Sequence, residues 1–264
     1  MNRMLQRQAG LTLVELMIGM MLGLLLVLGI TQVFMASRQT LATNDLMSRM
    51  QENGRFALEF MARSARQAGY IAPGSTLNRP NPVEAITCGL GNSTSNPCSS
   101  NGAGAASDIV SFSFEPPLID GDKRDCAGTT VPDDVIIINT FYIAPADANN
   151  PQPSLACKSF NRTNNAVITP QQRLIDGVES LQVLYGVDNG SRSDSANEYV
   201  SANRVTNWSK VLSVRIAVLV NSIDADNRAA VQRNHYLLDA NPFVTNDQLA
   251  RQIFTTTVQF KNIY

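Results

Sequence analysis

A single carboxylate, Glu15, stands at the start of a long apolar segment in this chain of 264 residues. Residues 16–37 carry no charged side chain, and as a helix they would span roughly 33 Å, about the thickness of a bilayer core. A carboxylate near the centre of such a helix costs about 2.5 to 3.5 kcal/mol, and less toward the interface. Glu15 is therefore a functional candidate, and the alternative interpretation is a solvated residue at headgroup level.

The charges beside this segment predict its orientation. Arg3 and Arg7 precede it, and Arg38 is the first charge after it. A basic leader this short keeps the N-terminus in the cytoplasm and places the rest of the chain on the exported side. A secretory signal has a shorter apolar core followed by an A-x-A-like cleavage site, and the sequence has neither. We therefore expect a single membrane span that is retained.

The four cysteines all follow the apolar segment, and an oxidising compartment favours disulfides there. An even number suggests two disulfides, for which three connectivities exist. We favour the sequential pairs, Cys88 with Cys98 and Cys126 with Cys157, which would stabilise the fold by roughly 3 and 4 kcal/mol through restriction of the unfolded chain. No zinc site is expected, because C-x-x-C is absent and His235 is the only histidine.

One polar loop offers several oxygen ligands within a short span, at Asp188, Asn189, Asp194 and Glu198. These residues are candidates for a calcium site. Their spacing does not match the EF-hand pattern, which needs oxygen ligands at alternate positions and a terminal Glu. A solvated hairpin turn at Asn189 and Gly190 is the simpler interpretation.

The sequence gives little support for catalysis or nucleic-acid binding. The motifs G-x-S-x-G and H-E-x-x-H are absent, and one histidine leaves little for Ser/His or Cys/His chemistry, so we expect no enzyme activity and no cofactor. The pI of about 5.9 and the scattered basic residues do not indicate a nucleic-acid-binding surface.

The helix that follows the apolar segment is predicted from a repeat of three to four residues. Residues 38–72 repeat small and apolar side chains every three or four positions, as an amphipathic helix does, and Gly69, Pro73 and Gly74 end it. The expected buried stripe consists of Leu46, Met50, Ala57, Phe60 or Met61, Ala65 and Ala68.

The remaining chain reads as loop and strands. Residues 78–107 are rich in Gly, Asn, Ser and Pro and predict a loop. Because no long helix separates the apolar runs that follow, we expect an antiparallel sheet with one face on the helix and the other in solvent. The expected strands lie at residues 108–114, 135–143, 166–169, 178–187, 211–222 and 253–263.

The string GLTLVEL, residues 10–16, resembles the class III signal of type IV pilins and pseudopilins. In that family a prepilin peptidase cuts after the glycine and methylates the new N-terminus, which implies cleavage between Gly10 and Leu11 and N-methylation of Leu11. The family usually has Phe in the place of Leu11, and it often has a proline in the first helix, whereas the first proline here is Pro73. The resemblance implies that Glu15 pairs with the Leu11 amine of a neighbouring subunit.

Three later segments, residues 177–190, 208–222 and 251–263, resemble the head of PilW-like minor pilins. This implies a minor pilin anchored in the inner membrane, with its head in the periplasm, that helps prime pilus assembly. The implied partners are other minor pilins, the major pilin, the prepilin peptidase and inner-membrane lipid, and no nucleic acid. A J-type pseudopilin of type II secretion and a membrane-anchored adhesin or receptor are the alternatives.

The expected fold is therefore α+β and pilin-like. A long N-terminal α-helix, with a transmembrane half and an amphipathic half, packs on a C-terminal antiparallel β-sheet head domain. The expected divisions are a removed leader at residues 1–10, a transmembrane and assembly helix at 11–37, an amphipathic helix at 38–72 and a β-rich head at 73–264.

Overall fold

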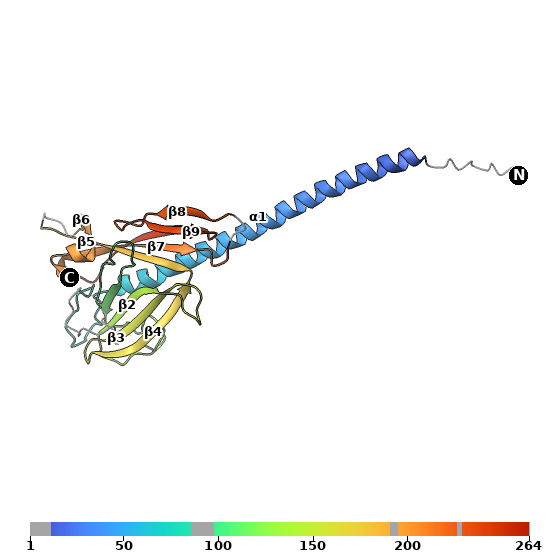
Figure 1. Cartoon of the computed structure of the whole chain (residues 1–264). Coiled ribbons are helices and arrows are strands. Elements are labelled where there is room, and N and C mark those ends of the chain that lie inside the picture. Colours follow the sequence, from blue (N-terminus) through green and yellow to red (C-terminus); the bar gives the residue numbers. More distant parts are fainter. Residues whose placement is uncertain (1–11, 86–97, 191–194, 226–228, 264) are drawn as a thin grey trace. The chain divides into compact units, whose positions relative to one another are not determined.

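The computed structural model describes residues 12–85, 98–190, 195–225 and 229–263. The chain divides into two compact units, Met1–Asp45 and Leu46–Tyr264. Helix α1 (Leu13–Gln67) has 55 residues, begins in the first unit and ends in the second. The expectation of one long N-terminal helix is confirmed (Figure 1).

The second half of α1 buries one stripe of small and apolar side chains. Met50, Ala57, Met61 and Ala65 are at most 2% exposed and recur every four or seven residues, as expected for the core-facing side of a helix. Phe60, which the sequence offered as an alternative to Met61, is instead 40% exposed. Met61, and not Phe60, therefore belongs to the buried stripe, and the Phe60 side chain is partly exposed.

The chain turns at Gly69, just beyond the end of α1. Gly69 has a φ of 75°, a conformation that favours glycine. Its N–H donates to the carbonyl of Ser113 at 2.9 Å, and a Cβ at this position would lie 2.5 Å from the carbonyl oxygen of Asn262. Glycine therefore lets the helix end fit between two other segments of the head.

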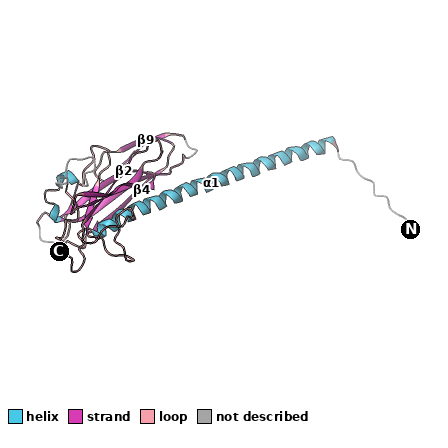
Figure 2. Cartoon of the chain, turned by 90° about the horizontal axis from the view of Figure 1, so that it is seen from below, coloured by secondary structure: helices cyan, strands magenta, loops and turns pink. Residues whose placement is uncertain are grey.

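The described part of the head contains two four-stranded antiparallel sheets and one two-stranded hairpin. The first sheet has the order β1-β2-β3-β4 and the second has the order β10-β7-β5-β6, while β8 pairs with β9. The two sheets lie on opposite sides of the last part of α1 in Figure 1, and Figure 2 shows the strands around that helix end from below. The bounds are β1 (Val110–Phe114), β2 (Ile137–Ala144), β3 (Ser154–Asn161), β4 (Ala166–Asp176), β5 (Val178–Val187), β6 (Glu198–Val200), β7 (Val211–Asn221), β8 (Val231–His235), β9 (Phe243–Asp247) and β10 (Arg251–Gln259), with short 3-10 helices at Ala202–Arg204 and Trp208–Lys210.

The α+β class is as expected, but the strands and sheets are more numerous. Each of the six expected runs contains a strand, and β3, β6, β8 and β9 were missed. Four of the five residues of β8 are exposed, so that strand has no apolar alternation from which to predict it. The expected single sheet is instead two sheets that share α1 as their packing partner.

The chain passes from one sheet to the other at Gly177, between β4 and β5. This residue has a φ of 80°, and a Cβ here would lie 2.9 Å from the side-chain oxygen of Asn221. Its N–H donates to the carbonyl of Pro153, and its carbonyl accepts from the N–H of Asn221, both at 2.8 Å. Gly177 thus joins the two sheets at a point where a larger residue would be strained.

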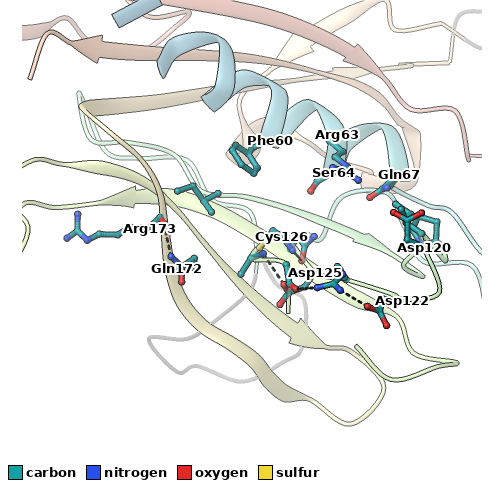
Figure 3. Close-up of a pocket in the computed structure, with 17 residues that line it drawn as sticks. Phe60, Arg63, Ser64, Gln67, Asp120, Asp122, Asp125, Cys126, Gln172 and Arg173 are labelled. Atoms are coloured by element: carbon teal, nitrogen blue, oxygen red, sulfur yellow. Dashed lines mark hydrogen bonds and ion pairs between the residues drawn. The ribbon is translucent and has the colours of Figure 1, made fainter. Parts of the chain in front are cut away.

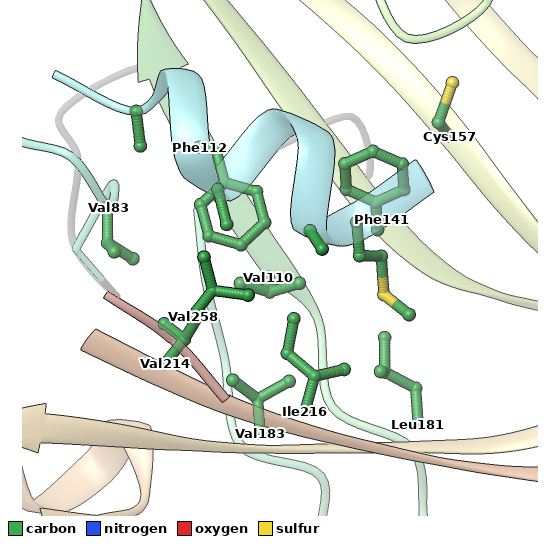
Figure 4. Packing of buried hydrophobic residues seen from close by; sticks show 14 of the residues in the cluster. Val83, Val110, Phe112, Phe141, Cys157, Leu181, Val183, Val214, Ile216 and Val258 are labelled. Carbon is green, nitrogen blue, oxygen red and sulfur yellow. The ribbon is translucent and has the colours of Figure 1, made fainter. Parts of the chain in front are cut away.

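One hydrophobic core lies between α1 and the inner faces of both sheets (Figure 4). Phe112 and Phe141 enter it from the first sheet, and Val183 and Ile216 enter it from the second. Buried side chains of β5, β7 and β10, among them Leu181, Val218 and Val258, also belong to this cluster. Trp208 is partly buried against this core and packs edge-on against Tyr185 at a ring-centroid distance of 5.1 Å.

Candidate functional site

The first turn of α1 holds Glu15 in a helix-capping arrangement. Thr12 directly precedes the helix, and its Oγ1 accepts a hydrogen bond from the N–H of Glu15 at 3.3 Å. Thr followed three residues later by Glu is the spacing of a capping box, and a carboxylate in the first turn also interacts favourably with the helix dipole. The predicted cleavage residues, Gly10 and Leu11, lie outside the described residues. Glu15 therefore has a local structural role that the sequence interpretation missed, although the TLVE spacing signals it.

The helix that follows Glu15 presents an apolar surface. The large apolar side chains from Leu13 to Leu41 are each 50% to 74% exposed. By length and composition this helix is able to cross a membrane, with a mean hydropathy of 2.5 over its most apolar window. Arg38 is the first charged residue after Glu15 along this helix, and its guanidinium lies 4.6 Å from the ring centroid of Phe34. Such a surface is stable only against lipid or other apolar helices.

One of the two expected disulfides, and one cysteine of the other, lie in the described part of the head. Cys126 and Cys157 form a disulfide that ties the segment before β2 to the buried face of β3, with a Cα–Cα distance of 6.4 Å. Cys98 is also disulfide-bonded, and its expected partner, Cys88, lies outside the described residues. The pair Cys88–Cys98 therefore stays a prediction.

Peptide mapping without reducing agent is expected to recover two linked peptides, one with Cys126 and Cys157 and one with Cys88 and Cys98. The first pair follows from the structure, and the second follows from the sequential pairing of the remaining cysteines. Mass spectrometry of the digest before and after reduction makes the comparison. Recovery of crossed pairs would contradict this connectivity, and four free thiols in exported protein would also contradict export into an oxidising compartment.

Three of the four calcium candidates lie in the described part of the chain, and two of them bind other protein groups. Asp188 accepts a hydrogen bond from the N–H of Gly190 at 3.0 Å, and Glu198 pairs with Arg204 at 3.8 Å. Asp194 lies outside the described residues. Within the described ranges no group of three His, Cys, Asp or Glu side chains is placed to hold a metal ion. β5 and β6 pair antiparallel on either side of this loop, as the two strands of a hairpin do.

Comparison with known proteins supports this arrangement at both ends of the chain. The prokaryotic N-terminal methylation motif matches residues 5–31, and the family described as Type IV Pilus-assembly protein W matches residues 140–262. A type IV-like pilin, TTHA1219 from Thermus thermophilus, has a similar solved structure, with a TM-score of 0.47 and 15% sequence identity over 82% of this chain and 99% of that chain. A search of curated proteins gave no match.

The methylation motif, the long apolar helix and the antiparallel β-rich head together define a type IV pilin-like protein. The match over residues 140–262 covers β3 to β10, so this part of the head is similar to the family described as Type IV Pilus-assembly protein W. These features indicate a membrane-anchored protein with a structural rather than a catalytic function. They also indicate that its interaction partners are other pilins.

Proposed function

We propose that the protein is a minor pilin of a type IV pilus, anchored in the inner membrane with its head in the periplasm. In this role it primes pilus assembly together with other minor pilins and the major pilin. The observation that carries the proposal is the exposed apolar surface of α1 behind a methylation motif, with Glu15 as its only charge before Arg38. The match to the pilus-assembly family in the head supports the priming role.

Glu15 connects this surface to filament assembly. Prepilin peptidase would cut between Gly10 and Leu11 and leave a cationic, methylated amine at Leu11. Isolated in an apolar helix bundle, the Glu15 carboxylate is unfavourable, because charges in low-dielectric surroundings need a partner. The Leu11 amine of a neighbouring subunit supplies that partner, so the charge favours the assembled state over the isolated subunit.

Processing tests the first step of this proposal. Intact-mass measurement of protein purified from the native host should show the loss of residues 1–10 and the addition of one methyl group at Leu11. The matched control is Gly10→Val, because a branched side chain at this position blocks close approach to the scissile bond, and this variant should keep Met1. A wild-type protein that keeps Met1 beside an active prepilin peptidase, or that is cut after Ser37, would contradict the class III signal.

The priming role is tested separately from processing. Deletion of the gene should leave few or no surface pili while the major pilin accumulates in the membrane, and the wild-type copy should restore them. Loss of secretion of type II substrates with normal piliation would instead favour the pseudopilin alternative.

A further inference from the structure

A cavity of about 550 Å³ lies between the second half of α1 and the first sheet. Phe60, Ser64 and Gln67 reach it from the helix, and Cys126 and Gln172 lie on its opposite side (Figure 3). All of its lining residues belong to the unit Leu46–Tyr264. Its volume is within the range of roughly 300 to 1,000 Å³ that small-molecule sites occupy. Neither the signal at the N-terminus nor the apolar part of α1 contributes to it.

Two largely buried polar side chains line this cavity. Ser64 is 5% exposed and Asn139 is 2% exposed. The Oδ1 of Asn139 accepts from the N–H of Cys126 at 3.4 Å, and both Asn139 and Ser64 present polar side-chain atoms among the residues that line the cavity. Buried polar atoms are almost always paired, with protein, water or ligand. The cavity therefore offers at least one donor and one hydroxyl to a molecule that enters it.

The charges around the cavity balance and are largely paired within the protein. Three arginines and three aspartates line it, namely Arg63, Arg124, Arg173, Asp120, Asp122 and Asp125. Arg124 pairs with Asp122 at 2.5 Å, Arg173 pairs with Asp147 at 2.8 Å, and Asp125 accepts from the hydroxyl of Thr169 at 2.6 Å. Because the lining carries as many cations as anions, it gives no net electrostatic preference for an anion or a cation, and a neutral ligand fits this balance.

A purely apolar ligand fits this lining poorly, because it would cover the polar atoms of Ser64 and Asn139 without offering them hydrogen bonds. The ligand must both donate and accept hydrogen bonds, and it must also present an apolar face to Phe60, whose ring is 40% exposed at the cavity wall. We propose that this cavity binds a neutral disaccharide. Sugar hydroxyls serve the amides of Asn139, Gln67 and Gln172, and the C–H face of the ring packs on Phe60.

An extended peptide is the competing ligand, and the neighbouring strand disfavours it. A peptide that adds to a sheet needs free backbone donors along the edge. The edge strand beside the cavity, β4, contains Pro170, which has no N–H, and its pairing with β3 is interrupted by register shifts. Side chains rather than a regular backbone edge therefore provide the recognition groups here.

The test uses the full chain in phospholipid nanodiscs, because detergents with sugar headgroups would compete for the cavity. Saturation-transfer NMR is recorded with lactose, cellobiose and N,N′-diacetylchitobiose, and with glucuronic acid and a Gly-Ser-Thr peptide for comparison. At least one neutral disaccharide should give a saturable signal. Phe60→Ala and Ser64→Ala should each weaken its binding by roughly tenfold, the size of one lost hydrogen bond or packing contact.

Phe56→Ala is the matched control, because Phe56 is also 40% exposed on α1 but does not line the cavity. It should leave saccharide binding unchanged. Thermal unfolding of each variant verifies that the head stays folded. The proposal would be overturned if none of the three disaccharides gave a saturable signal or if Phe60→Ala and Phe56→Ala bound equally well. Stronger binding of glucuronic acid or of the peptide would overturn it as well.

Discussion

Replacement of Glu15 by Leu is expected to give a protein that inserts and is cleaved normally but does not enter pili. Insertion should be as efficient as in the wild type, because the substitution removes an intramembrane charge. Assembly should suffer, because the Leu11 amine of the neighbouring subunit loses its counter-charge. Breaking one side of a buried ion pair typically costs about 3 to 5 kcal/mol, a factor of hundreds or more in an assembly equilibrium.

Membrane fractionation and intact mass measure anchoring and cleavage, and electron microscopy counts surface pili in a strain with the variant as its only copy. Glu15→Gln should give an intermediate number of pili. Normal piliation with Glu15→Leu, beside a deletion strain without pili, would contradict the proposed ion pair. An anchored receptor or adhesin likewise predicts no separation between anchoring and assembly.

The hydrogen bond between Thr12 and the N–H of Glu15 supplies a control for helix capping. Thr12→Ala removes the capping oxygen, at a cost of about 0.5 to 2 kcal/mol, but keeps the carboxylate of Glu15. If the charge acts in assembly, Thr12→Ala should form far more pili than Glu15→Leu. Equal loss of pili in the two processed variants would show that the start of the helix, rather than the ion pair, is what assembly requires.

Replacement of Arg251 by Met is expected to destabilise the head by about 3 to 5 kcal/mol. The Arg251 side chain is 4% exposed, and its Nε and Nη2 donate to both oxygens of Glu179 at 2.5 and 2.9 Å. Its two terminal nitrogens also donate to both oxygens of Asp247 at 2.6 Å. The cluster therefore ties the start of β10 to β5 and to the end of β9. Without Arg251, Glu179, whose side chain is 10% exposed, would become a buried charge with no counter-ion.

Denaturant unfolding of the full chain, followed by circular dichroism, measures this loss. The matched control is Arg204→Met, which removes an exposed pair with Glu198 at 3.8 Å, and it should cost less than about 1 kcal/mol. The double variant Glu179→Leu/Arg251→Met should recover much of the loss, because an apolar pair can replace a buried ion pair. A loss no larger than that of Arg204→Met would contradict the assigned role of Arg251.

The cluster should also contribute to acid sensitivity. Hydrogen bonds from Arg251 hold the pKa of Asp247 below its ordinary value of 3.8. Burial alone would lower the pKa of Arg251, but the hydrogen bonds that its guanidinium donates to Asp247 and Glu179 raise that pKa above its usual range. Because the folded pKa of Asp247 is lowered, its contribution is complete above pH 3.8 and is lost as the pH falls through the folded value. Arg251→Met should therefore lose less stability than the wild type over that acidic interval.

Local sequence patterns determined the features whose causes are local. The membrane-length helix follows from the uncharged run of residues 16–37, and β5 and β7 follow from runs rich in apolar and β-branched side chains. The N-terminal methylation motif is also contained in one short string of residues. Such periodicities and motifs can be read without knowledge of the fold, because neighbours in the chain are neighbours in the element.

Only the tertiary structure decided how distant segments meet. Glu179 and Arg251 are 72 positions apart in the sequence. The residues around each of them do not predict that the two form a buried ion pair. The cavity at Ser64 and Asn139 requires α1, β2 and β4 to converge. The division into two sheets depends on the turn at Gly177, and the mostly exposed β8 has no apolar pattern of its own. These features arise from packing between segments that are remote in sequence. The contacts that stabilise them therefore cannot be predicted from local sequence patterns.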